Sequence, residues 1–308
     1  MLTKKQVALV KLESNYNTDS VPTVAANEIL VESIEVSTEG LKMLDRPTPK
    51  NTLGNYAPVY AGSLRAINIV CRYRGSGAAG TAPEMGPLMQ ACGLGETVNA
   101  GVSVVYAPVS SGFKSVTIYR YRDGKLQKYT GCVGSLQVSQ TTLDYHKFTF
   151  SMIGHFVSET DATLVTPTYD ATIPAAVKGG AFTVGGYASV ISKLEFDLGN
   201  VIAQEPDYSS TDGYGTLQIV DRNVTGSFDP NNVLVATKDF MTVFTAGTPQ
   251  ALATGTLGPA AGNKLAIAMP AITFTDHSEN DADGISKLEI PFYAAESSGD
   301  DQVTFTLT

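Results

Sequence analysis

Alternation of apolar and polar residues with period two dominates this sequence and limits the folds open to it. The pattern is clearest in residues 31–36, 65–73 and 115–121, and the last of these leads into the dipeptide Asp123-Gly124. Side chains of a β-strand point to opposite faces in turn, so the pattern is typical of half-buried strands, and Asp-Gly is a strong hairpin turn. Long helical periodicity is absent. The sequence therefore predicts a mainly β protein.

Two short helices are expected to interrupt the strands. The first is predicted to open near Thr81, with Pro83 in its first turn, and to close at residues 93–95. The second has Asp229 as its expected N-cap and Pro230 at its first helical position, and it is predicted to run to a stop at Gly247.

The order of the predicted elements repeats along the chain. Strand 31–36 before Gly40 corresponds to strand 190–196 before Gly199, and polar loops rich in Tyr and Gly follow at 46–62 and 204–215. A strand, a helix and a final hairpin then follow in each half. We therefore predict two tandem β-sandwich or half-barrel modules, each with a short flanking helix. The predicted divisions are an N-terminal arm (1–27), a first module (28–165), a linker (166–180) and a second module (181–308). A single long β-sandwich with similar hairpins is the alternative.

Charge and cysteine content narrow the classes of function. The formal net charge is −9 at pH 7, which argues against a protein that grips nucleic acid and suits a surface that nucleic acid passes without sticking. Cys71, Cys92 and Cys132 have neither C-x-x-C nor metal spacing, so we expect small buried side chains in a reducing cytoplasm. Residues 1–11 are expected to be ordered and not a signal peptide.

Two segments resemble ligand-binding motifs. Residues 75–80 fit G-x-G-x-x-G, but that fingerprint needs a parallel βαβ unit, and the hairpins around it are predicted to be antiparallel. We expect a loop between a strand and a helix there. Residues 276–284 are acidic, yet Ile290 stands where a calcium loop needs a bidentate carboxylate. A solvated hairpin tip is favoured, and an irregular calcium site stays open as the alternative.

Spacing provides no support for catalysis. His146, His155 and His277 lack partners at metal-ligand spacing, and no G-x-S-x-G nucleophile elbow is present. We therefore predict no catalytic residue, no cofactor and no metal site, and we expect the protein not to be an enzyme.

Several segments, in the same order along the chain, resemble the tail tube proteins of phages with long, non-contractile tails. The clearest are residues 80–94, 105–110 and 115–119 in the first half, and 197–200, 212–214, 226–230 and 235–240 in the second. The resemblance covers nearly the whole chain, and its specificity lies in the sum of the segments. It implies a structural virion protein whose strands join those of neighbours into one tubular sheet, since closure removes exposed sheet edges.

The resemblance also implies how the subunit assembles and where. Such tubes have sixfold symmetry, so three two-module chains, or six chains if the duplication is wrong, would complete a homo-oligomeric ring. Stacked rings would form a conduit for DNA ejection in the virion tail, assembled in the bacterial host cytoplasm. The implied partners are the tape measure, tail terminator and tail-tip proteins, with genomic DNA passing through the lumen unbound and no membrane involved.

Two sets of residues are candidates for these roles. Contacts between rings are expected from the N-terminal arm and from the two polar loops. The loop candidates are Arg46, Tyr56, Tyr60, Asp207, Tyr208 and Tyr214. The candidates for a negatively charged lumen that repels phosphate are Glu35, Glu39, Glu195 and Asp197. The alternative function is a tail-tip or carbohydrate-binding β-sandwich module, which usually exposes aromatic platforms; the chain has no Trp.

Overall fold

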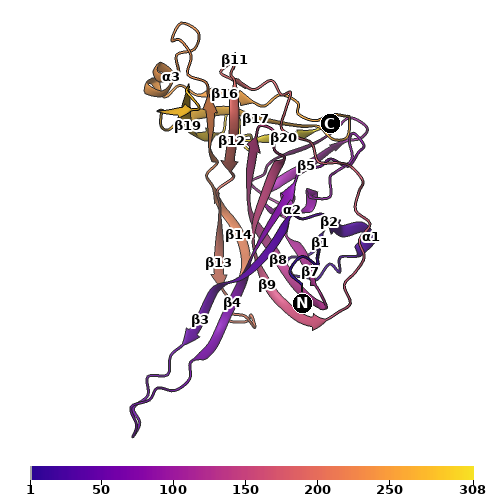
Figure 1. Cartoon of the computed structure of the whole chain (residues 1–308). Coiled ribbons are helices and arrows are strands. Elements are labelled where there is room, and N and C mark those ends of the chain that lie inside the picture. Colours follow the sequence, from indigo (N-terminus) through magenta and orange to yellow (C-terminus); the bar gives the residue numbers. More distant parts are fainter. Residues whose placement is uncertain (1) are drawn as a thin grey trace.

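The chain folds into one large antiparallel sheet system with few helices. The computed structural model describes residues 2–308. An 18-stranded sheet and a separate two-stranded ribbon make up most of it, so the predicted mainly β class is confirmed. Figure 1 shows an elongated body from which one long hairpin projects.

The elements of the first half are mostly long strands. They are β1 (Gln6–Leu12), α1 (Val24–Asn27), β2 (Glu28–Ile29), β3 (Ser33–Leu44), β4 (Val59–Arg72), α2 (Gly86–Ala91), β5 (Leu94–Asn99), β6 (Ser103–Pro108), β7 (Val116–Arg122), β8 (Lys125–Thr141) and β9 (His146–Asp161). The predicted turn at Asp123-Gly124 joins β7 to β8, with φ of +37° and +103°.

The second half repeats many of these elements with shorter strands. They are β10 (Thr183–Val184), β11 (Tyr187–Ala188), β12 (Ile191–Asp197), β13 (Asn200–Pro206), β14 (Tyr214–Arg222), β15 (Thr225–Pro230), α3 (Phe240–Ala246), β16 (Gln250–Ala253), β17 (Leu265–Phe274), β18 (Ser278–Ala282), β19 (Ile285–Ala295) and β20 (Thr304–Leu307).

Strand pairing follows the same order in both halves. The first half pairs in the order β3–β4–β9–β8, and the second in the order β12–β15–β19–β17. On the far side, β1–β7–β8 corresponds to β10–β16–β17. Gly40 and Gly199 take similar left-handed conformations, with φ of +58° and +61°. This pairing order supports the predicted duplication, whose boundaries stay a prediction.

The halves are joined through both sheet and core. Residues 137–141 of β8 pair with residues 193–197 of β12, and β20 pairs back with β6. The Phe305 ring lies 6.1 Å from Phe148 of the first half and 6.0 Å from Phe196 of the second. One hydrophobic cluster therefore extends through both halves.

The N-terminal segment takes part in the sheet. Residues 6–12 of the predicted arm form β1, which pairs along its whole length with β7, and Ala8, Leu9 and Val10 are buried. Glu13 then accepts hydrogen bonds from the Ser115 and Thr117 hydroxyls at 2.6 and 2.9 Å. These contacts fix the start of the chain against the first half.

The prediction of a helix from Asp229 to Gly247 is wrong in its first half. The Asp229 carboxylate accepts from the backbone N–H groups of Ser192 (2.8 Å) and Lys193 (2.6 Å) and from Lys287 Nζ (2.8 Å), which holds residues 225–230 as strand β15. Helix α3 begins instead at Phe240, with Asp239 as its N-cap. It ends as predicted at Gly247, whose φ is +60°.

Two further predictions differ in detail. Helix α2 is one turn shorter at its start than predicted, with Pro87 and not Pro83 in its first turn. Residues 278–282 of the acidic segment form β18, which pairs with β19 around a turn at Asp283 and Gly284. It is a hairpin, as favoured.

The Asp229–Lys287 pair links three strands, so its loss is expected to weaken the second half. Asp229→Ala leaves Lys287 without its partner in a site where both side chains are about 15% exposed, and breaking such a pair costs about 3–5 kcal/mol. Urea unfolding should show this loss, whereas Asp45→Ala, at an exposed loop residue, should change the free energy of unfolding by less than about 0.5 kcal/mol.

The same pair predicts a pH dependence. Burial by itself raises the pKa of Asp229, but the hydrogen bonds from Lys287 and Ser192 outweigh it and hold the pKa below the ordinary 3.8. A depressed carboxyl pKa stabilises the fold above the ordinary value, and this stabilisation is lost as pH falls through the folded-state pKa. The difference between wild type and Asp229→Ala should therefore shrink in acid. A constant difference down to full acid unfolding would contradict this.

Candidate assembly surfaces

The two polar loops that the sequence singled out lie toward the same end of the molecule and meet at their bases. Residues 45–58 form the tip of the β3–β4 hairpin, and residues 207–213 join β13 to β14 (Figure 1). Tyr214 Oη donates a hydrogen bond to the Gly40 carbonyl oxygen at 2.6 Å. A Cβ atom on Gly62 would lie 2.1 Å from the Asp212 carbonyl oxygen, so this approach requires glycine. The second loop therefore braces the base of the first.

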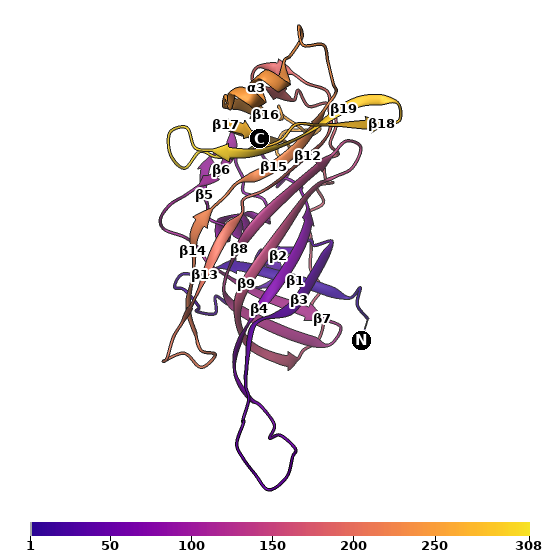
Figure 2. The same cartoon turned by 90° about the vertical axis from the view of Figure 1, so that its left-hand side faces the viewer.

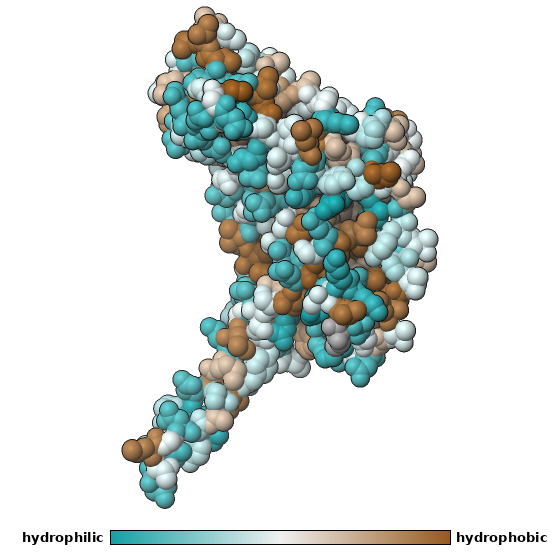
Figure 3. Space-filling model, viewed as in Figure 1, coloured by the Kyte–Doolittle hydropathy of each residue, from teal (hydrophilic) through white to brown (hydrophobic). Residues whose placement is uncertain are grey.

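Beyond that brace, residues 41–60, here called the long hairpin, project from the body. Arg46 and Lys50 lie over the Tyr56 ring, at 4.9 and 4.4 Å from its centroid. Apolar side chains remain uncovered along both strands and at the tip, where brown surface is visible in Figure 3. They are Leu41, Met43, Leu44, Leu53 and Val59. Exposed apolar side chains concentrated on a projecting element are typical of a surface that contacts another molecule.

The structure brings some of the predicted loop residues together and leaves others apart. Arg46 and Tyr56 stack on each other, and Tyr60 Oη lies 2.8 Å from Ser63 Oγ. Tyr208 is fully exposed at the tip of its own loop. Asp207 accepts from the Ser209 backbone N–H at 2.8 Å, so it shapes that loop locally. Their role in contacts between rings stays a prediction.

Three of the four candidate lumen carboxylates lie on one face of the continuous sheet. Directly paired residues share a face, as do residues two apart on a strand. Glu195 accepts from Ser139 Oγ at 3.0 Å, and Asp197 accepts from Ser135 Oγ at 2.8 Å. Ser135 and Ser151 are paired, as are Ser151 with Asn68 and Asn68 with Glu35. These side chains are polar, and the strands β3, β4, β9 and β8 that carry most of them lie side by side in Figure 2.

The fourth carboxylate lies at the margin of that face. Glu39 pairs with Leu64, which is buried against Leu217 of β14. The β13–β14 ribbon therefore covers the sheet next to Glu39, while the part around Glu35 stays open as a groove of about 460 Å³ that includes Glu35, Asn68, Ser135 and Ser151.

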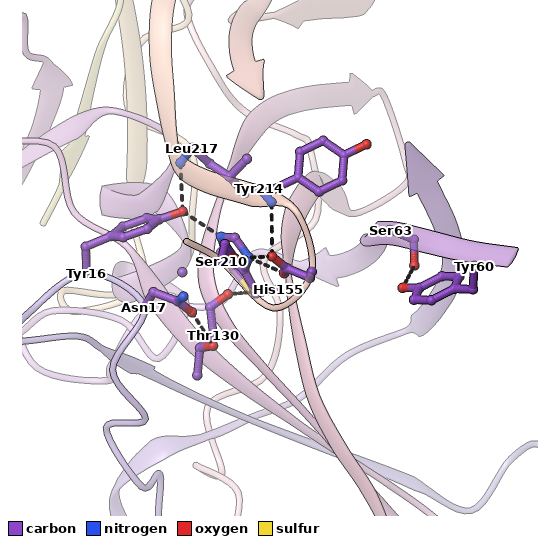
Figure 4. A network of polar contacts seen from close by, with 12 residues as sticks. Tyr16, Asn17, Tyr60, Ser63, Thr130, His155, Ser210, Tyr214 and Leu217 are labelled. Carbon is purple, nitrogen blue, oxygen red and sulfur yellow. Dashed lines mark hydrogen bonds and ion pairs between the residues drawn. The ribbon is translucent and has the colours of Figure 1, made fainter. Parts of the chain in front are cut away.

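A polar network that sequence analysis missed ties the N-terminal segment to the second loop. His155 Nδ1 lies 2.6 Å from Asp212 Oδ2, and His155 Nε2 lies 3.0 Å from Tyr16 Oη (Figure 4). Tyr16 Oη also accepts from the Leu217 backbone N–H at 2.7 Å. Nothing in the spacing of these residues could have signalled the network, because Tyr16 and Leu217 are 201 positions apart.

The protonation of this network suits a structural role. Burial raises the pKa of Tyr16 to about 12, so its hydroxyl keeps its proton near neutral pH. Burial alone would raise the pKa of Asp212, but hydrogen bonds from Ser210 and His155 hold it below its ordinary value. With a neutral imidazole, Tyr16 donates to Nε2 while Nδ1–H donates to Asp212. Each polar atom then has a partner, and the loop is fixed to β9.

The two strands at the ends of the longest continuous strand order have a partner on only one side. Within residues 2–308, β3 pairs only with β4, and β18 pairs only with β19. They are the two ends of the strand order β3–β4–β9–β8–β12–β15–β19–β18. The outer edge of each carries backbone groups that no other strand in the described part of the chain pairs.

The remaining motifs show no ligand-binding arrangement. The 75–80 loop packs against the loop before β17, where Gly75 N–H donates to Asn263 Oδ1 at 2.8 Å, and α2 follows it without a parallel strand. The three cysteines are free and buried, as expected. Among residues 2–308, no three His, Cys, Asp or Glu side chains are grouped to hold a metal, and no helix is long and apolar enough to cross a membrane.

Removing the Tyr16 hydroxyl tests the network. Tyr16→Phe leaves the Leu217 N–H and His155 Nε2 without that partner, and an unsatisfied buried group costs about 1–3 kcal/mol. We expect that loss in the free energy of unfolding, measured with urea, together with faster amide exchange in residues 207–213. Tyr208→Phe is the matched control, since its ring is fully exposed. If both variants unfold at the same urea concentration, the network does not stabilise the loop.

Comparison with known proteins identifies the family of the chain. No curated protein matches the chain. The family model described as phage tail tube protein matches residues 46–308, which include the tip and the second strand of the long hairpin, the whole second half and every strand of the shared sheet from β4 onward. Because this match covers most of the chain, the protein belongs to the phage tail tube protein family.

Proposed function

We propose that copies of this chain polymerise into stacked rings that form a phage tail tube, and that DNA passes through its lumen during ejection. The family match carries the structural role. The open edges of β3 and β18 support polymerisation, because an unpaired strand edge is a ready surface for another strand. The charge of −9 supports a surface that DNA passes without binding.

The shared order of strand pairing in the two halves supports a ring of three chains. If each half occupies one position of a sixfold ring, three chains complete it. The tape measure, tail terminator and tail-tip proteins are the proposed partners, and the host cytoplasm is the proposed place of assembly. The ring contacts are the β3 and β18 edges, and the stacking contacts are the long hairpin and the 207–213 loop.

Electron microscopy of concentrated protein distinguishes this proposal from a tail-tip or carbohydrate-binding module. Tubes or stacked rings support it, whereas uniform small particles that bind a glycan would favour the other function. A ring-to-ring contact is heterologous, so it does not close and produces a filament.

The open polar face predicts an effect of charge on DNA passage. Reversing Glu35, Glu195 and Asp197 to Lys should make assembled tubes retain DNA at low salt and slow ejection, because each Lys adds a phosphate contact whose strength falls with salt. Neutral replacement by Gln, Gln and Asn should have an intermediate effect, and Glu296→Lys, in an exposed loop, should have none. Unchanged ejection in the triple Lys variant would mean that this face does not line the lumen.

The long hairpin predicts a separate effect on stacking. Leu53→Asp introduces a charge at its exposed tip and should prevent tubes while leaving the unfolding free energy within about 0.5 kcal/mol of wild type. Leu143→Asp, at the exposed β8–β9 turn, is the control and should still form tubes. Negative-stain images decide the result, and tubes of normal length in Leu53→Asp would contradict the role of the hairpin.

A further inference from the structure

The junction between the two halves provides a template for the contact between two chains. Within one chain, β12 is held between β15 and residues 137–141 of β8. The corresponding strand of the first half, β3, has β4 on one side and, within the described residues, no strand on the other. If the halves repeat one pattern, the missing neighbour of β3 is the counterpart of β8 from another copy.

Matching the registers identifies that counterpart. Ile34 pairs with Ile69, which pairs with Phe150. In the second half, Leu194 pairs with Phe228, which pairs with Ile290. Ile290 thus corresponds to Phe150.

Two residues further back along the same strands, Leu288 corresponds to Phe148. The partner of Phe148 is Val138, and the partner of Leu288 is Glu279. Residues 278–282, which are the whole of β18, are therefore the counterpart of residues 137–141 of β8.

The same matching places residues 33–37 on residues 193–197. Ile34-Glu35-Val36 corresponds to Leu194-Glu195-Phe196, with an apolar residue on either side of a glutamate. We propose that β18 of one copy pairs antiparallel with the outer edge of β3 of the next copy, in the register that β8 and β12 have within the chain. The intermolecular pairs are Ser33 with Ala282, Ile34 with Asp281, Glu35 with Asn280, Val36 with Glu279 and Ser37 with Ser278. This inference rests on the proposed ring assembly and names its contact.

A second observation, independent of the repeat, supports this register through charge. A pocket of about 280 Å³ beside Val36 is lined by Arg65, Arg120 and Arg122. Arg122 Nε is buried and has no hydrogen-bond partner within residues 2–308. Because directly opposed residues share a face, Glu279 of the next copy would lie beside Val36, at the mouth of this pocket. A buried guanidinium N–H without an acceptor is costly, and an incoming carboxylate would satisfy it.

The neighbouring pair has the same complementarity. Arg120 Nη2 donates to the Ile34 carbonyl oxygen at 3.1 Å, so a guanidinium already lies at this edge, and Asp281 is the residue placed opposite Ile34. That carbonyl oxygen can still accept a bond from a paired strand, because it has two lone pairs. Glu159, the carboxylate that lines the pocket, already accepts hydrogen bonds from Lys125 and Gln127. Two acidic residues of β18 thus face two arginines near β3.

Disulfide trapping tests the register with swapped cysteine pairs. Ser37→Cys with Ser278→Cys, and Ser33→Cys with Ala282→Cys, place the two sulfurs on directly paired residues, where Cα atoms lie about 4.5–5.5 Å apart and a disulfide forms readily. The swapped pairs, Ser37→Cys with Ala282→Cys and Ser33→Cys with Ser278→Cys, are displaced by four residues, roughly 14 Å along the strand. Six strands separate β3 from β18 within one chain, so a bond between them links two chains. Cys71, Cys92 and Cys132 are buried and contribute no background.

In oxidised tubes, both in-register variants should give covalently linked chains on denaturing gels, and the swapped variants should fall to the level of single-cysteine controls. Glu279→Lys should abolish ring formation, and Glu296→Lys should not. If tubes form but the swapped pairs crosslink, the register is wrong while the tube function stands. The same conclusion follows if tubes form and neither set of pairs crosslinks. If wild-type protein forms neither rings nor tubes, the proposed function fails and this inference fails with it.

Discussion

Backbone hydrogen bonding at the edges of the sheet is the constraint on which the rest of the structure depends. A strand edge presents N–H and C=O groups that need partners, and a soluble protein covers, shortens or pairs them. This chain pairs one such edge internally, where β8 meets β12, and it continues the sheet from one half into the other. The outer edges of β3 and β18 have no such partner among residues 2–308. The same strand order thus contains one paired junction, between β8 and β12, and two strand edges, on β3 and β18, that are open to pairing.

The two halves share their pairing order but differ where the chain leaves the sheet. In the first, β3 and β4 continue past Gly40 as the long hairpin, which projects from the body. In the second, β13 and β14 fold back, and Leu217 covers Leu64 and Val133 of the first half. The Tyr16–His155–Asp212 network then fixes that ribbon. Equivalent loops therefore differ in their contacts, since the second packs against the first half and the first projects from the body along most of its length.

Local pattern predicted the strands and their turns well, because period-two alternation and Asp-Gly are local signals. The partners of Asp229 were not predictable this way. Asp-Pro is a good helix start on propensity, but Lys287, which is 58 positions away, converts the aspartate into a strand-to-strand link. The His155 network was missed for the same reason. The family resemblance suggested the two loops and the polar face as surfaces. Their positions in space depend on which strands pair, and pairing between distant strands cannot be read from local sequence patterns.

Charge acts at two ranges in this molecule: repulsion at long range opposes association, and attraction at short range favours one alignment. Copies with a net charge of −9 repel one another at long range, which opposes association. At 0.1 M salt this repulsion is largely screened beyond a Debye length of roughly 10 Å. The arginines beside β3 are at least partly buried, and Arg122 Nε is shielded from solvent, so a carboxylate seated there would be screened far less. In the proposed ring, diffuse repulsion would keep wrongly aligned copies apart, and the local ion pairs would stabilise only the alignment that places acidic side chains at the pocket. The register of the proposed contact would then depend on the same acidic composition that is proposed to keep DNA from binding to the polar face.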